Sequence, residues 1–239
     1  MSLLDEPVTD NAGNTYPQIA APAPDRPLTF TRRRIDKVLV GFGVLAAVVF
    51  AVAGGLLTWG ANFSDDYVHD ELTAQRISFP AEEALLDEGR DDLVKYAGQP
   101  LDTGAKAEAY ASYIDGHLQK TGAKYADEGA APLTYAELGV PERAARAAVT
   151  EATEAGAPAD EIAELQATAD EVSADRNTLF KGETLRGLLL SAYAWSTVGQ
   201  IAGYAAIGAF VAAAGMAVLV VLGLVHYNRM THHKVAPTA

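Results

Sequence analysis

The residues best suited to metal or acid–base chemistry follow the first long apolar stretch. His69 is flanked there by four carboxylates, those of Asp65, Asp66, Asp70 and Glu71. On a helix His69 would share a face with Asp65 and Asp66, and imidazole with carboxylate is a donor set that divalent cations accept. We keep His69 as a candidate metal ligand, with solvated helical carboxylates as the alternative, and assign no metal site.

The other patterns favour no reaction. His117 lies at the edge of an apolar helical face, which predicts a packed, hydrogen-bonded side chain. The sequence has no Gly-rich phosphate loop, no G-x-S-x-G and no H-E-x-x-H. It also has no cysteine, which excludes a thiolate nucleophile and disulfides. We therefore predict a protein that is not an enzyme and binds no cofactor.

Charge is unevenly distributed along the 239 residues. The net charge is −13, and residues 60–195 carry 26 acidic and 11 basic side chains. Nucleic-acid phosphates require a basic face, so we expect no nucleic-acid partner.

Two apolar stretches organise the chain. Residues 38–64 carry no charged side chain, and neither does the run from Gly187 to Val225, which is 39 residues long. As a helix that run would reach about 58 Å, roughly twice the ~30 Å core of a bilayer. We predict one membrane helix over residues 35–60 and a second over 193–227, continuous with a long outer helix.

Basic residues predict the orientation. Arg32, Arg33 and Arg34 precede the first span, and Arg229 follows the second. Cytoplasmic flanks are enriched in Lys and Arg, so both termini should be cytoplasmic and residues about 62–190 extracytoplasmic. A cleaved export signal, ending near Ala51-Val52-Ala53, is the alternative. The apolar run continues past Ala53, which favours a retained anchor.

The expected fold class is all-α, with two transmembrane helices and an acidic extracytoplasmic helical module between them. A disordered cytoplasmic tail over 1–34, rich in proline, precedes the first span. The module covers 61–192, with Thr103 capping a helix over 104–120 and a protruding helical hairpin over 141–176. Residues 228–239 form a second cytoplasmic tail.

Small residues recur at intervals of four in both spans. Such rows allow close helix packing in lipid, so we expect the two rows to face each other or a partner's helices. The alternative is that Ala and Gly are simply abundant in this chain. The rows are Gly43, Ala47, Ala51 and Gly55, and Ala205, Ala209, Ala213 and Ala217.

An apolar stripe just outside the second span is the best interaction surface in the sequence. Packing within the protein's own core is the equally weighted alternative. The predicted interaction residues are Phe180, Leu185, Arg186, Leu188, Leu189, Tyr193 and Trp195.

The stretch from Thr178 to Leu190, followed by Ala192-Tyr193-Ala194, resembles a family of two-pass actinobacterial membrane proteins, as does Tyr96-Ala97-Gly98-Gln99. Members are often labelled aromatic ring-opening dioxygenase subunits. Extradiol ring opening needs two His and a carboxylate on iron, whereas the exported part has only His69 and His117, on separate helices. The resemblance therefore implies the two-pass topology and not the labelled activity.

These features predict a membrane accessory or scaffolding subunit of a larger cell-envelope complex, with a respiratory assembly as one example. Its partners would be membrane lipid and other integral membrane subunits. The alternative is an extracytoplasmic sensor or ligand-binding membrane protein.

Overall fold

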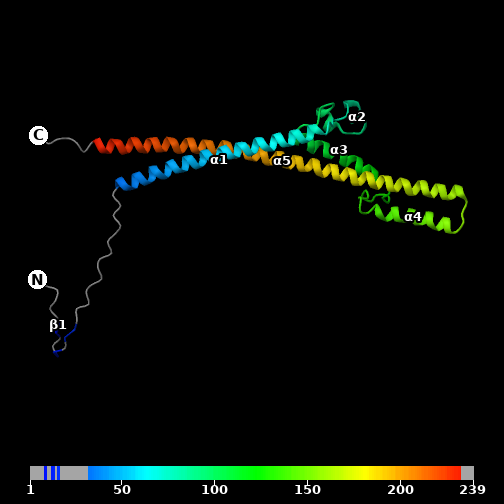
Figure 1. Cartoon of the computed structure of the whole chain (residues 1–239), viewed down its shortest axis with the longest axis horizontal. Helices are drawn as coiled ribbons and strands as arrows, with labels where there is room; N and C mark the ends of the chain where they lie inside the picture. Colours follow the sequence, from blue (N-terminus) through cyan, green and yellow to red (C-terminus); the bar gives the residue numbers. More distant parts are fainter. Residues whose placement is uncertain (1–7, 10–11, 14, 17–31, 233–239) are drawn as a thin grey trace.

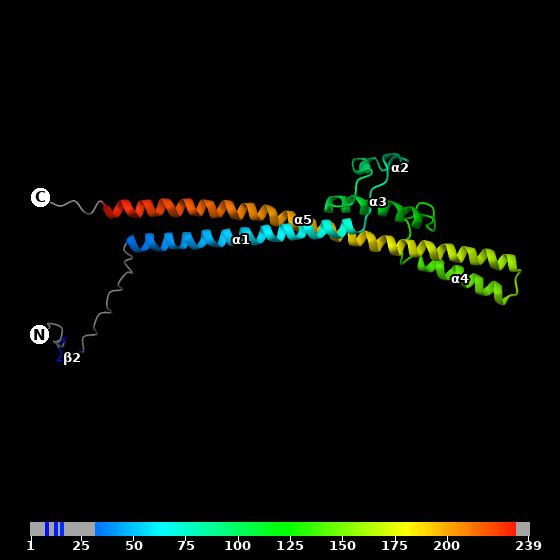
Figure 2. The same ribbon diagram turned by 45° about the horizontal axis from the view of Figure 1, so that its top comes forward.

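The computed structural model describes residues 8–9, 12–13, 15–16 and 32–232, and in this part the protein is an elongated, mainly helical molecule. Two long helices, α1 (Arg32–Ala74) and α5 (Ala159–His232), lie side by side and run in opposite directions (Figures 1 and 2). Shorter helices pack around the N-terminal half of α5. The all-α fold with two long apolar helices is thus confirmed.

Both long helices expose their apolar side chains. Each contains a segment long and apolar enough to cross a membrane, and most of each segment is not covered by the rest of the protein. Leu39, Phe42 and Trp59 on α1 and Ile201 and Val211 on α5 are all more than 60% exposed. Lipid is the solvent that such surfaces match, because it has no hydrogen bonds for apolar groups to disrupt.

α5 is longer than the pattern indicated. The sequence predicted a helical hairpin over 141–176 and a long outer helix continuous with the second span, but α5 runs through both without a break for 74 residues. Gly182 lies inside this helix, and Leu118 of a neighbouring helix packs against it where a Cβ would be. At 1.5 Å per residue α5 is about 111 Å long.

Three short helical elements follow α1. They are α2 (Glu82–Asp87), the 3₁₀ helix η1 (Asp91–Tyr96) and α3 (Gly104–Ala123). Gly89, with φ of 71°, separates α2 from η1. Thr103 caps α3 as expected, and its hydroxyl accepts a hydrogen bond from the Lys106 amide.

A helical hairpin forms the end of the molecule farthest from the membrane-compatible segments (Figure 1). It consists of α4 (Gly139–Glu154) and the first turns of α5. Gly156, with φ of 70°, ends α4, and the Ala157 amide donates to the Ala152 carbonyl. We call residues 77–186 the head. It contains α2, η1, α3, α4 and the first part of α5.

Two small apolar cores hold the head on the long helices. The first joins the end of α1 to α3 and α5 through Val68, Leu72, Phe79, Leu101, Ala107, Ala111 and Leu189. The second joins α3, the start of α4 and α5 through Leu118, Leu138, Val172 and Leu179. α5 contributes to both cores, so the whole head is packed on this one helix.

Most of the two tails lies outside the described residues. Within the predicted disordered tail over 1–34, β1 (Val8–Thr9) and β2 (Thr15–Tyr16) pair in antiparallel register, and α1 already begins at Arg32. Within the predicted tail over 228–239, α5 extends to His232.

Candidate functional site: the α1–α5 contact and its outer cavity

The contact between α1 and α5 follows an alternating three-and-four spacing. Such spacing keeps one seam in register along two packed helices. The seam positions on α1, buried or half-buried, are Val40, Gly43, Ala47, Gly54, Leu57, Ala61, Ser64 and Val68. Those on α5 are Ser196, Gly199, Gly203, Ala206, Ala213, Met216, Val220, Gly223 and Tyr227.

Glycines set the closeness of this contact. A Cβ at Gly43 would lie 2.8 Å from Val220 Cγ2, and one at Gly54 would lie 2.9–3.0 Å from the Phe210 ring. Neither position can carry a side chain without displacing its neighbour. The large residues on one helix thus fill spaces left by glycine on the other.

The predicted i, i+4 rows only partly coincide with this seam. Four residues turn a helix by about 400°, so each step rotates the row by about 40° away from a partner. On α1, Gly43 and Ala47 lie in the contact while Ala51 and Gly55 are exposed.

The row on α5 divides in the same way, and the exposed members of both rows remain available to other helices. Ala209 and Ala213 are half-buried and Ala205 and Ala217 are exposed.

Polar contacts mark both ends of the pair. At the end nearer the head the buried Ser64 hydroxyl donates to the Trp195 carbonyl at 2.6 Å, and Gly104 of α3 packs against Ser196. At the opposite end the Lys37 ammonium lies 6.0 Å from the centre of the Tyr227 ring. α1, α3 and α5 therefore meet where α5 leaves its apolar segment.

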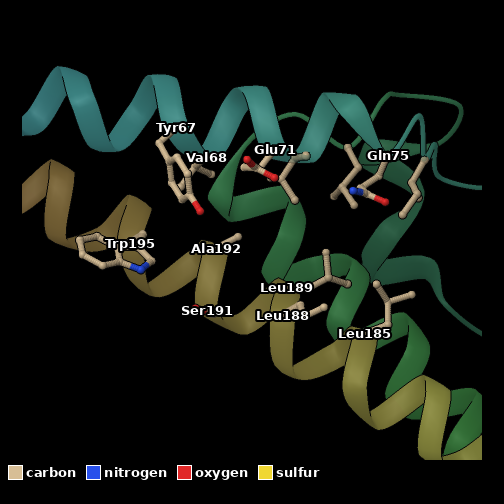
Figure 3. Close-up of a pocket in the computed structure, with 13 residues that line it drawn as sticks. Tyr67, Val68, Glu71, Gln75, Leu185, Leu188, Leu189, Ser191, Ala192 and Trp195 are labelled. Carbon is tan, nitrogen blue, oxygen red and sulfur yellow. The ribbon is translucent and has the colours of Figure 1, made fainter.

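A cavity of about 280 Å³ opens between α1 and α5 just beyond this point. Figure 3 shows Tyr67, Glu71 and Gln75 on the α1 side, and Leu185, Leu189 and Trp195 on the α5 side. Its lining is mainly apolar. The residues that line it are Tyr67, Val68, Glu71, Leu72, Gln75, Ile77, Leu101, Leu185, Leu188, Leu189, Ser191, Ala192 and Trp195.

Four of the predicted interaction residues line this cavity. Leu189 is buried in the first core and Leu185 packs against that core, so these two stabilise the head itself. Leu188 is 65% exposed and Trp195 52% exposed, so they form the open side. The predicted apolar stripe is therefore divided. Leu185 and Leu189 belong to the core of the head, whereas Leu188 and Trp195 are exposed surface.

The other three predicted interaction residues lie elsewhere. Phe180 is exposed, with its ring 5.4 Å from that of Tyr135. Arg186 pairs with Asp115 on α3 at 3.3 Å and with Glu183 at 3.2 Å. Tyr193 is half-buried, and its backbone lies beside Gly104.

Three aromatic side chains stack along α1 and lead to the cavity. The sequence analysis did not identify this aromatic ladder. The rings of Trp59 and Phe63 stack at 5.7 Å, and those of Phe63 and Tyr67 at 6.2 Å. The i, i+4, i+8 spacing of these three residues was the available signal.

His69 and His117 serve as structural contacts. His69 Nδ1 lies 3.1 Å from the Asp102 carbonyl, which can only accept, so Nδ1 carries the proton and ties α1 to the start of α3. His117 Nε2 lies 3.0 Å from Glu88, whose other oxygen accepts from Tyr113. In the described part of the chain no group of three or more His, Asp or Glu could hold a metal ion.

Tyr113 and Tyr125 are tied to acidic partners in the head. Burial and its hydrogen bond to Glu88 raise the pKa of Tyr113 to about 12. Burial and its hydrogen bond to Asp175 likewise raise the pKa of Tyr125 to about 12. Both hydroxyls thus stay protonated and donate throughout the physiological range.

The α4–α5 hairpin is joined by a charged network. Glu142 on α4 accepts hydrogen bonds from Ser173 at 2.7 Å, Arg146 at 3.0 Å and Arg176 at 2.8 Å. The Ser173 bond, followed by those of the two arginines, lowers the pKa of Glu142. Arg176 also lies over the Tyr135 ring, 4.3 Å from its centre.

The comparisons with known proteins give no relatives: no family model, no curated protein and no solved structure matches this chain. The resemblance to two-pass actinobacterial proteins therefore stays a prediction, and functional inference rests on the structure alone.

Proposed function

We propose that this protein is a non-enzymatic integral membrane subunit that scaffolds or assists a larger cell-envelope complex. In this proposal α1 and α5 cross the membrane, both termini are cytoplasmic, and the acidic head lies outside. The antiparallel pair supports this orientation, because it brings Arg34 and Arg229 to the same end of the molecule.

The continuity of α5 is the observation that carries the proposal. If residues 198–225 lie in lipid, the 39 residues from Ala159 to Thr197 extend about 58 Å beyond it as one helix. Both cores of the head pack on this segment. Such a rigid arm suits a subunit that holds a surface at a fixed height above the membrane.

The outward-facing small residues support a helical partner within the membrane. Ala51 and Gly55 on α1, and Ala205 and Ala217 on α5, face away from the α1–α5 contact. A Cβ at Gly55 would meet nothing within 4 Å, so this face of α1 is open to another helix.

Affinity purification of the full chain in mild detergent tests this function. We expect stoichiometric membrane partners, and Gly55→Leu should reduce their recovery because it fills the open face. Val49→Leu, on an exposed face of the same helix about 120° away from Gly55, is the control and should leave recovery unchanged. A clean monomer or homodimer from the unaltered chain would contradict the proposal.

A second candidate is an extracytoplasmic sensor, and the cavity between α1 and α5 is the observation that favours it. A ligand there would contact both long helices where they leave the membrane-compatible segments. Sensing requires that the ligand binds one arrangement of the two helices better than another. Spin labels at the inner ends of α1 and α5 should then change separation when the cavity is filled, whereas a purely structural subunit keeps one distance.

A further inference from the structure

We propose that the cavity between α1 and α5 holds one hydrocarbon tail of a membrane amphiphile whose headgroup carries no net negative charge. This inference rests on the proposed placement of α1 and α5 in a membrane. It adds a ligand class to a cavity that the scaffolding role leaves unused.

The uncharged segment of α5 extends farther toward the head than the uncharged segment of α1. On α1 the first charged residue after the apolar segment is Asp65, and Ser64 lies opposite the Trp195 carbonyl of α5. α5 carries no Asp, Glu, Lys or Arg from Gly187 to Asn228. Residues 187–197 of α5 therefore continue an uncharged surface for about 16 Å beside the acidic end of α1.

Part of this extra surface is exposed. Leu188 and Trp195 are both more than half exposed and line the cavity together with Ala192. A leucine this exposed beyond the apolar segments costs hydrophobic free energy that an apolar ligand would recover. The surface is also continuous with the lipid-facing part of α5, so a membrane component can reach it without crossing water.

The dimensions favour a hydrocarbon tail over a protein segment. At about 280 Å³ the cavity lies near the lower limit of small-ligand pockets, which is roughly 300 Å³. From Tyr67 to Gln75 it follows α1 for about 12 Å. A helix is about 10 Å across with its side chains, so it cannot enter a space of this volume. A single slender chain can.

The aromatic ladder provides the route of entry. The exposed rings of Trp59, Phe63 and Tyr67 run up α1 in stacked contact, and Tyr67 forms part of the cavity wall. Trp195 stands on the opposite wall (Figure 3). Aromatic side chains favour the boundary between lipid and water, where they present an apolar face to a tail.

The charges around the cavity select the headgroup. Among its thirteen lining residues Glu71 is the charged one, and no Lys or Arg is present. Asp65, Asp66 and Asp70 lie on the same part of α1. Arg186, next to Leu185, is already paired with Asp115 and Glu183, and the exposed Arg76 beside Gln75 is outnumbered by these four carboxylates of α1. A net anionic headgroup would be repelled here, whereas a zwitterionic or neutral one would not.

Photocrosslinking of the full chain in lipid nanodiscs tests the proposal. The probe is a phosphatidylcholine with a photoreactive group at the end of one tail, and labelled peptides are identified by mass spectrometry. We expect labelling of residues 185–192 and 67–77 as well as of residues 38–64 and 198–225, which we place in lipid. Labelling confined to residues 38–64 and 198–225 would overturn the proposal while leaving membrane placement intact. A chain that does not enter nanodiscs would overturn both.

Matched variants separate occupation of the cavity from general contact with lipid. Leu188→Glu places a charge on the cavity wall and should reduce cavity labelling at least fivefold, and Leu190→Glu, outside the lining on the same helix, should not. Ala192→Phe fills the cavity and should act likewise, with exposed Ala194→Phe as its control. Equal labelling in all four variants would overturn the proposal.

The headgroup preference has its own measurement. A phosphatidylglycerol probe with the same photoreactive tail should label the cavity severalfold less than the phosphatidylcholine probe, and the difference should shrink at high salt. Equal labelling by the two probes at low salt would overturn the charge selection.

Discussion

The two halves of α5 are held by different kinds of interaction. In the apolar half, α1 and α5 approach through glycine and alanine, and Gly43 and Gly54 receive Val220 and Phe210. In the head, the hairpin with α4 is joined by hydrogen-bonded charges around Glu142. One continuous helix thus packs by close backbone approach where lipid would surround it, and by buried apolar side chains together with charged hydrogen bonds where water would.

The largest effect should come from a disulfide crosslink that tests directly how α1 and α5 pair. The chain has no cysteine, and a Cβ added at Gly203 lies 3.8 Å from that of Ala61, the mean separation in disulfides. Ala61→Cys with Gly203→Cys should crosslink almost completely on mild oxidation, as measured by mass spectrometry of the linked peptides. Ala61→Cys with Ala205→Cys is the control, because Ala205 is exposed. Equal crosslinking of both pairs would contradict the antiparallel register.

In the head, the second core should be the most sensitive position. Leu138 is fully buried between α3 and α5, so Leu138→Ala should destabilise the protein by about 2–5 kcal/mol. Thermal unfolding in detergent, followed by circular dichroism, measures the effect. Val140→Ala removes an exposed side chain two residues away and should change little. Equal losses would show that this core does not hold the hairpin.

In the apolar half, shape complementarity predicts a smaller but position-specific effect. Gly54→Val places a side chain against Phe210 and should cost about 1–3 kcal/mol. Gly55→Val is a matched control, since a Cβ there meets nothing within 4 Å and both glycines lie in the same helix. Hydrogen exchange of α1 amides in detergent compares the two variants. A larger effect at Gly55 would mean that a different face of α1 packs on α5.

The smallest effect should be a pH dependence of the stability of the α4–α5 hairpin. The pKa of Glu142 is lowered in the folded protein, so its contribution is present above the ordinary value of 4.5 and is lost as pH falls through the lower folded value. Hydrogen exchange of α4, corrected for intrinsic rates, should therefore accelerate in acid below about pH 4.5.

Glu142→Gln should weaken this acid dependence. Glu151→Gln, on the exposed side of the same helix, should leave it unchanged. An acid response of the same size in both variants would show that Glu142 does not join the hairpin.

The sequence predicted the helical fold because local signals decide it. The charge-free runs predicted the two long apolar helices, and Thr103 marked the start of a helix that the structure shows. The sequence analysis did not join the hairpin over 141–176 to the long outer helix, whereas α5 runs through both without a break.

The contacts between elements were harder to predict. The small-residue rows were drawn at intervals of four, whereas the contact between α1 and α5 alternates three and four. The cavity between α1 and α5 depends on which residues of α1 face Leu185 and Leu189, and that follows from the antiparallel register. Distant contacts of this kind have no signature in a single sequence.

The placement of the head outside the membrane is tested most directly by single cysteines in this cysteine-free chain. Glu154→Cys lies at the exposed end of α4, and Thr238→Cys lies in the C-terminal tail. On intact cells a membrane-impermeant maleimide should label residue 154 at once and residue 238 only after permeabilisation. Labelling of residue 238 on intact cells with protection of residue 154 would contradict the proposed orientation, and equal labelling of both would contradict the membrane crossing itself.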